Sequence, residues 1–377
     1  MSASERILVT GGAGFIGSHV VDKLIARGKS VVVLDNLDPQ VHGEGATRPS
    51  YLHPDAPLVV GDVRDRALVE KLVADSDAIV HLAAAVGLAQ SMYQVERFVD
   101  VNARGTAILL EAATKKGVSI RKILVASSMS LYGEGRCQCP TCGPFDPRLR
   151  PSAQLAQKDF EVRCPKCNAV SEPIATPEDA QLDATTTVYA VSKRDQEELV
   201  LSIGSAYGIP AAAFRLFNVY GPRQALSNPY TGVAAIFSSR LLNGNAPLVF
   251  EDGRQTRDFT HVSDIAEAFA LSLDEPKVDG GVFNVGAGRP YTLSQLGELL
   301  AAEIGTAWTP EITGQFRKGD IRHCTADHRA LEAATGFRPQ VDFRDGVRDL
   351  VAWVRGQKPA DNVGRALGEL KERGLVG

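Results

Sequence analysis

The sequence predicts an α/β protein built on a doubly wound parallel sheet, and three observations lead to this prediction. A glycine-rich turn near the N-terminus joins a strand pattern to a helix pattern. Short buried-strand patterns then alternate with helix patterns through the first half of the chain. A Tyr and a Lys stand four residues apart at Tyr189 and Lys193, after this alternation. Repeated strand–helix units form parallel sheets that bind ligands at the carboxyl ends of their strands.

Length and charge narrow the classes of function. The 377-residue chain can bury a sizeable core and is expected to form two lobes. Its formal charge of -4 argues against nucleic-acid binding, which usually requires a basic excess. No apolar run reaches the ~18 residues of a membrane helix. The first residues lead directly into a strand pattern without a secretory apolar region, so we expect a cytoplasmic protein.

The N-terminal segment has the order expected of a dinucleotide-binding unit. It places a strand at 7–10, a glycine turn at 11–17, a helix at 18–27 and a strand at 31–34, followed by Asp35. Gly11, Gly14 and Gly17 permit a tight turn and close approach of the backbone to a pyrophosphate, which the helix N-terminus attracts. Asp35 would bond the adenosine ribose hydroxyls and repel a 2'-phosphate, so NAD is favoured over NADP.

Further residues fall at the ends of the later strands. Strand patterns occur at 58–60, 78–82 and 123–126, with a helix pattern at about 103–116. The residues that follow these strands are Asp62, Ala83, Ala84, Ser127 and Ser128. Small residues after a strand are often ordinary packing, but they also let a cofactor lie close to the backbone.

Tyr189 and Lys193 would share one face of a helix. We expect the Lys193 ammonium to favour the phenolate and so to lower the pKa of Tyr189 from its usual value near 10. Such a phenol can exchange a proton with a sugar hydroxyl. The four-residue spacing alone also fits a solvated amphipathic helix. The catalytic interpretation is favoured because the glycine turn accompanies this spacing.

Seven motifs, in order, resemble the extended branch of the short-chain dehydrogenase/reductase superfamily, and most closely its NAD-dependent nucleotide-sugar epimerase and dehydratase group. The resemblance runs from residue 6 to about residue 355, apart from one insertion. The motifs occupy residues 10–17, 61–63, 81–84, 127–133, 189–193, 215–222 and 257–262.

The resemblance implies a tightly bound NAD, a nucleotide-diphosphate sugar as substrate, and a homodimer. It makes Tyr189 the general acid and base, with Lys193 tuning it and holding the nicotinamide ribose, and Ser128 bonding the reacting hydroxyl. The NAD contacts that it implies are Gly11, Gly14, Phe15, Ile16, Gly17, Asp35, Asn36, Asp62, Val63, Leu82, Ala83, Ala84, Asn102, Ser127, Tyr189 and Lys193. The implied substrate contacts are Ser128, Asn218, Arg257, Arg317 and Asp320.

Within this group the residues favour epimerisation at C4. Dehydratases of the group carry Asp-Glu directly after the active-site Ser or Thr, whereas this chain has Met129 and Ser130. Segments 222–230 and 253–258 are similar to those of 4-epimerases that interconvert dTDP-L-rhamnose and dTDP-6-deoxy-L-talose. Epimerisation of UDP-glucose or UDP-glucuronate is the first alternative, and decarboxylation of a nucleotide sugar is a further one. A net reductase is a further alternative, which Asp35 disfavours in its NADP-linked form and which tightly held NAD would argue against. A non-catalytic binder would not need the intact set of Ser128, Tyr189 and Lys193.

A cysteine-rich insertion at 134–182 separates the Ser and Tyr motifs. Cys139 and Cys142 form one Cys-Pro-x-Cys knuckle and Cys164 and Cys167 form another, with 21 residues between the two. Four such thiolates suit a closed tetrahedral zinc site, which we expect to be structural. Disulfides are disfavoured in cytosol, while Cys137 remains an alternative ligand. The insertion is expected to serve as a lid or an oligomer contact.

The remaining chain completes the expected domain organisation. Residues 1–217 form the NAD-binding domain, 218–355 form mainly a substrate lobe with returns to the sheet, and 356–377 form a C-terminal helix. Helix patterns in the substrate lobe occupy 234–242, 263–273 and 293–304. His261 and Cys324 are expected to be structural, and the C-terminal helix would dock on the body or on a partner chain.

Overall fold

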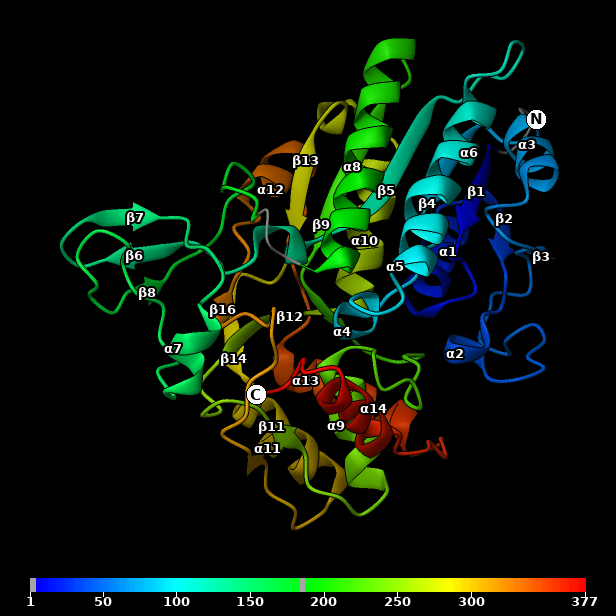
Figure 1. Ribbon diagram of the computed structural model, residues 1–377. Helices are drawn as coiled ribbons and strands as arrows, with labels where there is room; N and C mark the ends of the chain where they lie inside the picture. The colour runs from blue at the N-terminus through cyan, green and yellow to red at the C-terminus, as the bar shows by residue number, and fades with distance from the viewer. Residues whose placement is uncertain (1–4, 184–186) are drawn as a thin grey trace.

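A seven-stranded parallel sheet forms the centre of the larger lobe (Figure 1) in the computed structural model, which describes residues 5–183 and 187–377. Its order is β3-β2-β1-β4-β5-β9-β13, so the chain winds outward in both directions from β1 and β4. This reversal opens a crevice at the carboxyl ends of the central strands. The strands are β1 (Arg6–Thr10), β2 (Ser30–Asp35), β3 (Leu58–Val60), β4 (Ala78–His81), β5 (Lys122–Ser128), β9 (Ala211–Leu216) and β13 (Val282–Val285).

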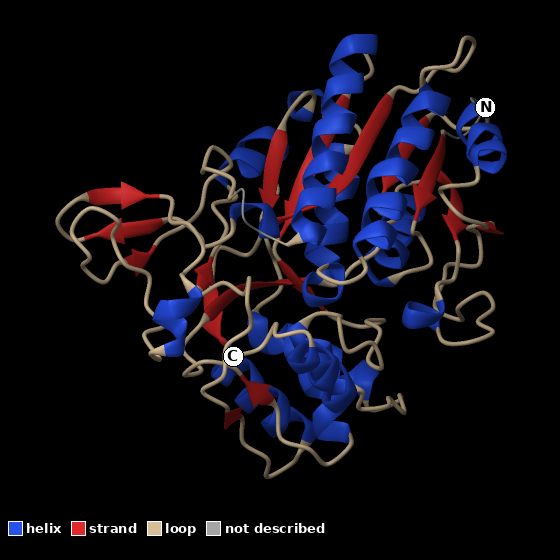
Figure 2. Cartoon of the chain, viewed as in Figure 1, coloured by secondary structure: helices blue, strands red, loops and turns tan. Residues whose placement is uncertain are grey.

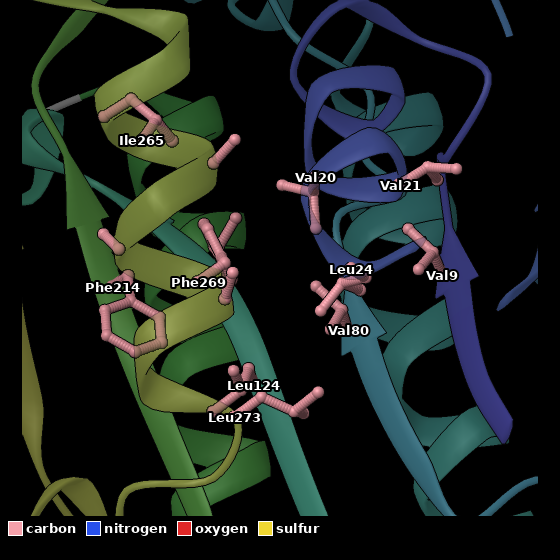
Figure 3. Close-up of a cluster of buried hydrophobic side chains, with 14 of the residues drawn as sticks. Val9, Val20, Val21, Leu24, Val80, Leu124, Phe214, Ile265, Phe269 and Leu273 are labelled. Atoms are coloured by element: carbon pink, nitrogen blue, oxygen red, sulfur yellow. The ribbon is translucent and has the colours of Figure 1, made fainter. Parts of the chain in front are cut away.

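Helices cover both faces of this sheet, which confirms the doubly wound α/β class. One face carries α1 (Phe15–Ala26) and α10 (Val262–Ser272), and the other carries α3 (Arg66–Ala74), α6 (Gly105–Ala113) and α8 (Val188–Tyr207). Alternate strand residues serve the two faces: Val9 joins the core under α1 and α10, and Leu8 joins the opposite core. Figure 3 shows side chains of α1 and α10 directed at Val9, Val80, Leu124 and Phe214 of the strands.

Two helix boundaries differ from the expected ones. Helix α1 begins at Phe15 rather than Ser18, because Gly17 already belongs to its first turn. The helix expected at 103–116 is a π-helical turn, η1 (Val99–Arg104), that continues into α6. Such wide turns recur at functional sites, and this one contains Asn102.

Short helical elements complete the larger lobe. They are α2 (Pro39–His42), α4 (Leu88–Ser91), α5 (Val95–Phe98), the 3-10 turn η2 (Met129–Tyr132), the 3-10 turn η3 (Pro276–Val278) and α12 (Arg329–Thr335). Edge strand β13 and helices α10 and α12 come from the C-terminal half of the chain, so that half returns to the sheet.

The smaller lobe lies beyond the carboxyl ends of the sheet strands (Figure 2). Its helices are α9 (Val233–Leu242), α11 (Leu293–Ile304) and α13 (Phe343–Val354), which share one apolar cluster. A mixed sheet joins β10 (Asn218–Tyr220), β12 (Thr256–His261), β14 (Pro290–Thr292) and β16 (His323–Cys324). A separate pair joins β11 (Leu248–Val249) to β15 (Glu311–Ile312).

The cysteine-rich insertion projects to one side of both lobes (Figure 1). Its sheet has the order β7-β6-β8, formed by β6 (Cys137–Cys139), β7 (Gly143–Phe145) and β8 (Glu172–Pro173). The short helix α7 (Ser152–Ala156) lies between β7 and β8 in the chain. The insertion contacts the smaller lobe through Gly135, whose N–H donates to the carbonyl of His323 at 2.8 Å.

The C-terminal helix α14 (Val363–Glu372) docks on the body of the same chain. The Glu369 carboxylate accepts hydrogen bonds from the hydroxyls of Tyr93 and Tyr230 at 3.0 and 2.9 Å. The last residues run beside segment 316–318, where Phe316 and Gly377 exchange two backbone hydrogen bonds. In the described part of the chain, no helix combines the length and apolar character that crossing a bilayer requires.

Candidate active site

The glycine turn between β1 and α1 is shaped by contacts that only glycine allows. Gly11 has a φ of 69°, and a Cβ there would lie 2.8 Å from the amide nitrogen of Ala83. A Cβ on Gly17 would lie 2.1 Å from the carbonyl oxygen of Gly11. The turn therefore brings the N-terminus of α1 close against the ends of β1 and β4, where free N–H groups can meet a phosphate.

Asp35, at the end of β2, holds this turn in place. Its carboxylate accepts a hydrogen bond from the N–H of Ala13 at 3.0 Å and another from that of Leu37 at 2.9 Å. A carboxylate has about four lone-pair sites, so Asp35 can still accept from ribose hydroxyls. Hydrogen bonds from Arg64 lower the pKa of the neighbouring Asp62 to about 2, which keeps that side chain anionic.

A cavity of about 620 Å³ extends from the glycine turn to Tyr189. Most of the residues expected to bind NAD or substrate line it: Gly11, Gly14, Phe15, Ile16, Gly17, Asp35, Asn36, Asp62, Val63, Leu82, Ala83, Ala84, Ser127, Ser128, Tyr189, Lys193 and Asn218. The ends of β1, β2, β4, β5 and β9 thus contribute to one space, as the sheet topology requires.

Helix α8 brings Tyr189 and Lys193 to this cavity. The helix begins after Thr187, whose hydroxyl caps it by accepting from the N–H of Ala190 at 3.3 Å. The Tyr189 N–H donates to the hydroxyl of Ser91 at 2.9 Å, which ties the first turn of α8 to α4. Ser128 stands at the end of β5, and its Oγ accepts from the hydroxyl of Ser130 at 2.9 Å.

The pKa of Tyr189 shifts in the direction opposite to the expected one. Burial raises the pKa of Tyr189, and a hydrogen bond with Ser128 opposes this only in part. Burial also lowers the pKa of Lys193 from 10.5 to about 7, with the Glu197 carboxylate opposing it. The Lys193 Nζ donates to the Gln196 Oε1 at 2.6 Å. The ammonium is thus itself desolvated and engaged by Gln196, so the Tyr–Lys spacing alone does not determine the pKa of the phenol.

Asn102 lies behind the cavity wall instead of lining it. Its side-chain amide donates to the carbonyl of Ala85 at 3.1 Å and to the hydroxyl of Ser192 at 2.9 Å, and its Oδ1 accepts from the N–H of Ala85 at 2.7 Å. Fully buried Asn102 therefore joins the loop after β4 to α8 and fixes the backbone that bears Tyr189.

Arg257, Arg317 and Asp320 form a cluster of their own and do not line the 620 Å³ cavity. The Asp320 carboxylate accepts from Arg257 at 2.9 Å and from Arg317 at 2.6 Å. These two guanidinium groups hold the pKa of the Asp320 carboxyl below its usual range, although burial opposes them. The pair of arginines is suited to binding a diphosphate beside the cavity.

Sequence reasoning missed several polar residues at the mouth of the cavity. Tyr230 and Asn228 line it, and the Asn228 Oδ1 accepts from the amide of Gln40 at 3.1 Å. Arg97 donates to Asp38 at 2.8 Å and to Gln40 at 3.1 Å. These contacts connect the larger lobe to the 228–230 loop across the cavity. Their signal in the sequence is weak, because no local spacing pairs residues 40 and 228.

The insertion brings together the four cysteines that were expected to bind zinc. The sulfur atoms of Cys139, Cys142, Cys164 and Cys167 all lie within 4.8 Å of one another. A tetrahedral zinc with bonds of about 2.3 Å spaces its sulfurs by a little under 4 Å, so the group can hold this metal. Cys137 lies outside the group, with its sulfur 3.5 Å from the carbonyl oxygen of Gly135.

His261 and Cys324 are structural, as expected. His261 caps α10 by accepting from the Ser263 N–H, and its Nδ1 lies 2.8 Å from the Ser263 hydroxyl. Cys324 is buried in a small cluster with Met129, Tyr132 and Phe217.

A comparison with known families agrees with this geometry. The sequence model described as "NAD dependent epimerase/dehydratase family" matches residues 7–151 and 166–286 of the chain. The match thus includes the glycine turn, Ser128, Tyr189, Lys193 and Asn218. The internal stretch that it omits, 152–165, lies inside the cysteine-rich insertion, and the match ends at residue 286, before Arg317 and Asp320.

Individual proteins show the same likeness. The dTDP-L-rhamnose 4-epimerase of Burkholderia thailandensis is 37% identical over 358 residues, which cover 93% of this chain and 95% of that protein. The solved structure of UDP-glucose 4-epimerase from Thermotoga maritima with UDP-glucose has a TM-score of 0.74 and 30% identity, covering 93% of this chain and 99% of its own. The Thermus thermophilus UDP-glucose 4-epimerase complex with NAD has a TM-score of 0.70 and 30% identity, covering 94% and 100%.

Proposed function

The chain belongs to the NAD-dependent epimerase/dehydratase family, and from this premise we propose that it is a 4-epimerase of a nucleotide-diphosphate sugar, most specifically of dTDP-L-rhamnose and dTDP-6-deoxy-L-talose. One observation carries the proposal: Ser128, Tyr189 and Lys193 face the same cavity as the glycine turn and Asp35. A proton-transfer group and a dinucleotide cradle therefore line the same cavity.

Tyr189, Ser128 and Lys193 each have a separate role in the proposed reaction. To act as a base Tyr189 has to be a phenolate, and the positive charges of the Lys193 ammonium and of a bound oxidised nicotinamide would favour that form against the effect of burial. Tyr189 then takes the proton of the 4-hydroxyl and gives a proton back once the 4-keto sugar has turned over in the site. Ser128 bonds the same hydroxyl. Lys193 holds the nicotinamide ribose, and an anionic Tyr189 beside it would raise its pKa and keep it protonated. A tightly bound NAD would supply the acceptor and donor of hydride at C4, so the reaction would need no added cofactor.

The glycine turn and the acids at the strand ends fit NAD. Gly14 lines the cavity, and a Cβ there would meet only the carbonyl oxygen of Gly11, at 3.4 Å, so the backbone lies open to a pyrophosphate. Asp35 and Asp62 both line the cavity near this turn. Their negative charge disfavours the 2'-phosphate of NADP.

Dehydration is disfavoured by the residues after Ser128. Eliminating water needs an acid and a base besides the tyrosine. Met129 offers neither, and the Ser130 hydroxyl donates to Ser128. The nearby Glu197 carboxylate is engaged by the Ser127 hydroxyl at 2.6 Å and by Arg215 at 2.6 Å. The site thus supports oxidation and reduction at C4 without elimination of water.

A neutral 6-deoxy sugar suits the cavity better than a uronate does. The arginines that line it are Arg64 and Arg97, and both are paired with carboxylates, of Asp62 and Asp38. A uronate would have to share Lys193 with the cofactor, or remain unpaired at a cost of several kcal/mol. The 37% identity to a dTDP-L-rhamnose 4-epimerase favours rhamnose over UDP-glucose, which is the second candidate.

The four clustered cysteines would hold a structural zinc. Four thiolates fill a tetrahedral coordination sphere and leave no position for substrate. The insertion has little apolar core of its own, since Leu155 and Phe160 share one small cluster with Phe316 of the smaller lobe. Its fold therefore depends on the metal and on its contacts with that lobe.

The protein would act in the cytoplasm as a homodimer. Val95, Val99 and Val191 are large apolar residues with 48%, 42% and 48% of their surface exposed. They come from α5, η1 and α8, which pack against one another. An exposed apolar patch of this kind is typical of a protein interface.

Replacing the phenol tests the proposed mechanism. Tyr189→Phe should abolish epimerisation, because the variant lacks the group that moves the proton, while NAD stays bound. Turnover is measured by proton NMR, and bound NAD is measured after protein denaturation. Activity close to wild type in Tyr189→Phe would remove the proposed base, and loss of NAD would show that Tyr189 is needed for the cofactor site instead.

A further inference from the structure

A buried charge cluster joins the cysteine-rich insertion to the smaller lobe. Its members are Glu134, Arg150 and Glu161 of the insertion and Glu251, Asp252 and Arg322 of the lobe. The side chains of Glu134, Arg150, Glu251 and Arg322 are at most 4% exposed. Arg150 donates to Glu134 at 2.7 Å and makes two bonds to Glu251, at 3.0 and 2.9 Å.

Arg322 completes the cluster from the other side. It donates to Asp252 at 2.6 Å, to Glu161 at 2.8 Å and to Glu251 at 3.1 Å. Four carboxylates therefore surround two guanidinium groups. Removing one partner of such a buried group leaves an unpaired charge, so the arrangement resists displacement of the insertion from the lobe.

The cluster also holds the backbone of residues 320–322, which bears Asp320, the carboxylate partner of Arg257 and Arg317. Arg150 donates to the carbonyl of Asp320 at 3.3 Å, and the Glu134 carboxylate accepts from the N–H of Arg322 at 2.5 Å. On the opposite side of this backbone, Arg257 donates to the carbonyl of Arg322 at 3.1 Å and to the Asp320 carboxylate. Residues 320–322 are thus clamped between the insertion and Arg257.

We propose that Arg150 and Glu134 are positioning residues, through which the insertion sets the orientation of Arg257 and Arg317 toward the nucleotide diphosphate of the substrate. The inference rests on the proposed function, because it takes a nucleotide-diphosphate sugar as the ligand. It gives the insertion a definite role, which is to stiffen the diphosphate site without taking part in the chemistry. Bidentate guanidinium–phosphate bonds depend on geometry, so displaced arginines bind a diphosphate less tightly.

Arg150→Met tests this assignment, since methionine keeps much of the side-chain volume and removes the charge and donors. Calorimetric titration first shows whether dTDP or UDP binds the wild type more tightly. We expect the affinity of the variant for that nucleotide to fall about tenfold or more, as the loss of one charged hydrogen bond would cause. KM for the nucleotide sugar should rise similarly, while kcat stays within about twofold. NAD and zinc content should not change. Arg136→Met is the matched control, because Arg136 pairs with Asp146 inside the insertion.

Glu134→Gln provides a second measurement if Arg150→Met does not fold. The amide keeps the shape but has a single oxygen, so it can accept from Arg150 or from the Arg322 N–H but not from both, and we expect a loss of nucleotide affinity in the same direction. Nucleotide affinity within about twofold of wild type in each variant that folds would overturn the proposal. A wild type that binds nucleotide but converts no sugar, with affinity still lost in the variants, would refute the epimerase function and support the positioning role.

Discussion

Lys193→Met should make the protein more stable while it abolishes activity. Only 3% of the Lys193 surface is exposed, and burial lowers its pKa from 10.5 to about 7. Below pH 7 the ammonium is charged in both the folded and the unfolded chain, and the folded protein carries the full cost of burying it. That cost is about 5 kcal/mol for a pKa displaced this far.

The sign of the pH dependence follows from the two pKa values. Between pH 7 and 10.5 the unfolded chain holds a proton that the folded chain has lost, so wild-type stability rises with pH through this window. Methionine removes the titrating group and also the hydrogen bond to Gln196, which contributes about 1 kcal/mol. We therefore expect Lys193→Met to be about 4 kcal/mol more stable at pH 6, with the advantage vanishing as the pH approaches 10.5.

Urea unfolding of protein freed of NAD, followed at pH 6, 8 and 10, measures this difference. Gln196→Met is the control for the pH dependence, because it leaves the ammonium while it removes the hydrogen bond to Lys193 together with those to Ala83 and Thr106. Lower stability of Lys193→Met at pH 6, or a difference that does not change with pH, would refute the claim that the folded protein buries Lys193 at a cost.

Two further predictions concern the insertion and the outer surface. Cys164→Ser should release the proposed zinc, because three thiolates hold the metal less tightly than four. Backbone hydrogen exchange in residues 134–180 should then increase. Retention of one zinc per chain in metal analysis would contradict the ligand assignment. If the wild type sediments as the proposed dimer, Val191→Asp should convert it to monomers, because it places a charge among the exposed apolar residues of α5, η1 and α8. An unchanged sedimentation coefficient would contradict this interface.

The features that sequence predicts well are those that depend on local periodicity. The glycine turn, the alternating strands and the Tyr189 helix each follow from spacing within a few turns or residues. The four cysteines that gather in the structure are identifiable because each Cys-Pro-x-Cys knuckle is itself local. The expected start of α1 lies three residues late, since Gly17 has the pattern of a turn although it packs inside the helix.

The features that sequence cannot predict depend on pairs of residues far apart in the chain. The Tyr189 pKa is governed by burial, which the Tyr–Lys spacing does not contain. Asn102 braces the loop at Ala85 from behind the cavity. The bonds from Arg150 to Glu251 and to Asp320 span more than 100 residues, so no local pattern indicates them.

The most direct test of the proposed reaction is to incubate the purified protein with dTDP-L-rhamnose, without added cofactor, and to follow the configuration at C4 by proton NMR. The proposal predicts that dTDP-6-deoxy-L-talose appears without net formation of NADH, because the retained NAD is regenerated in each cycle. Stoichiometric reduction of NAD, or no conversion of dTDP-L-rhamnose, UDP-glucose or UDP-glucuronate, would contradict it.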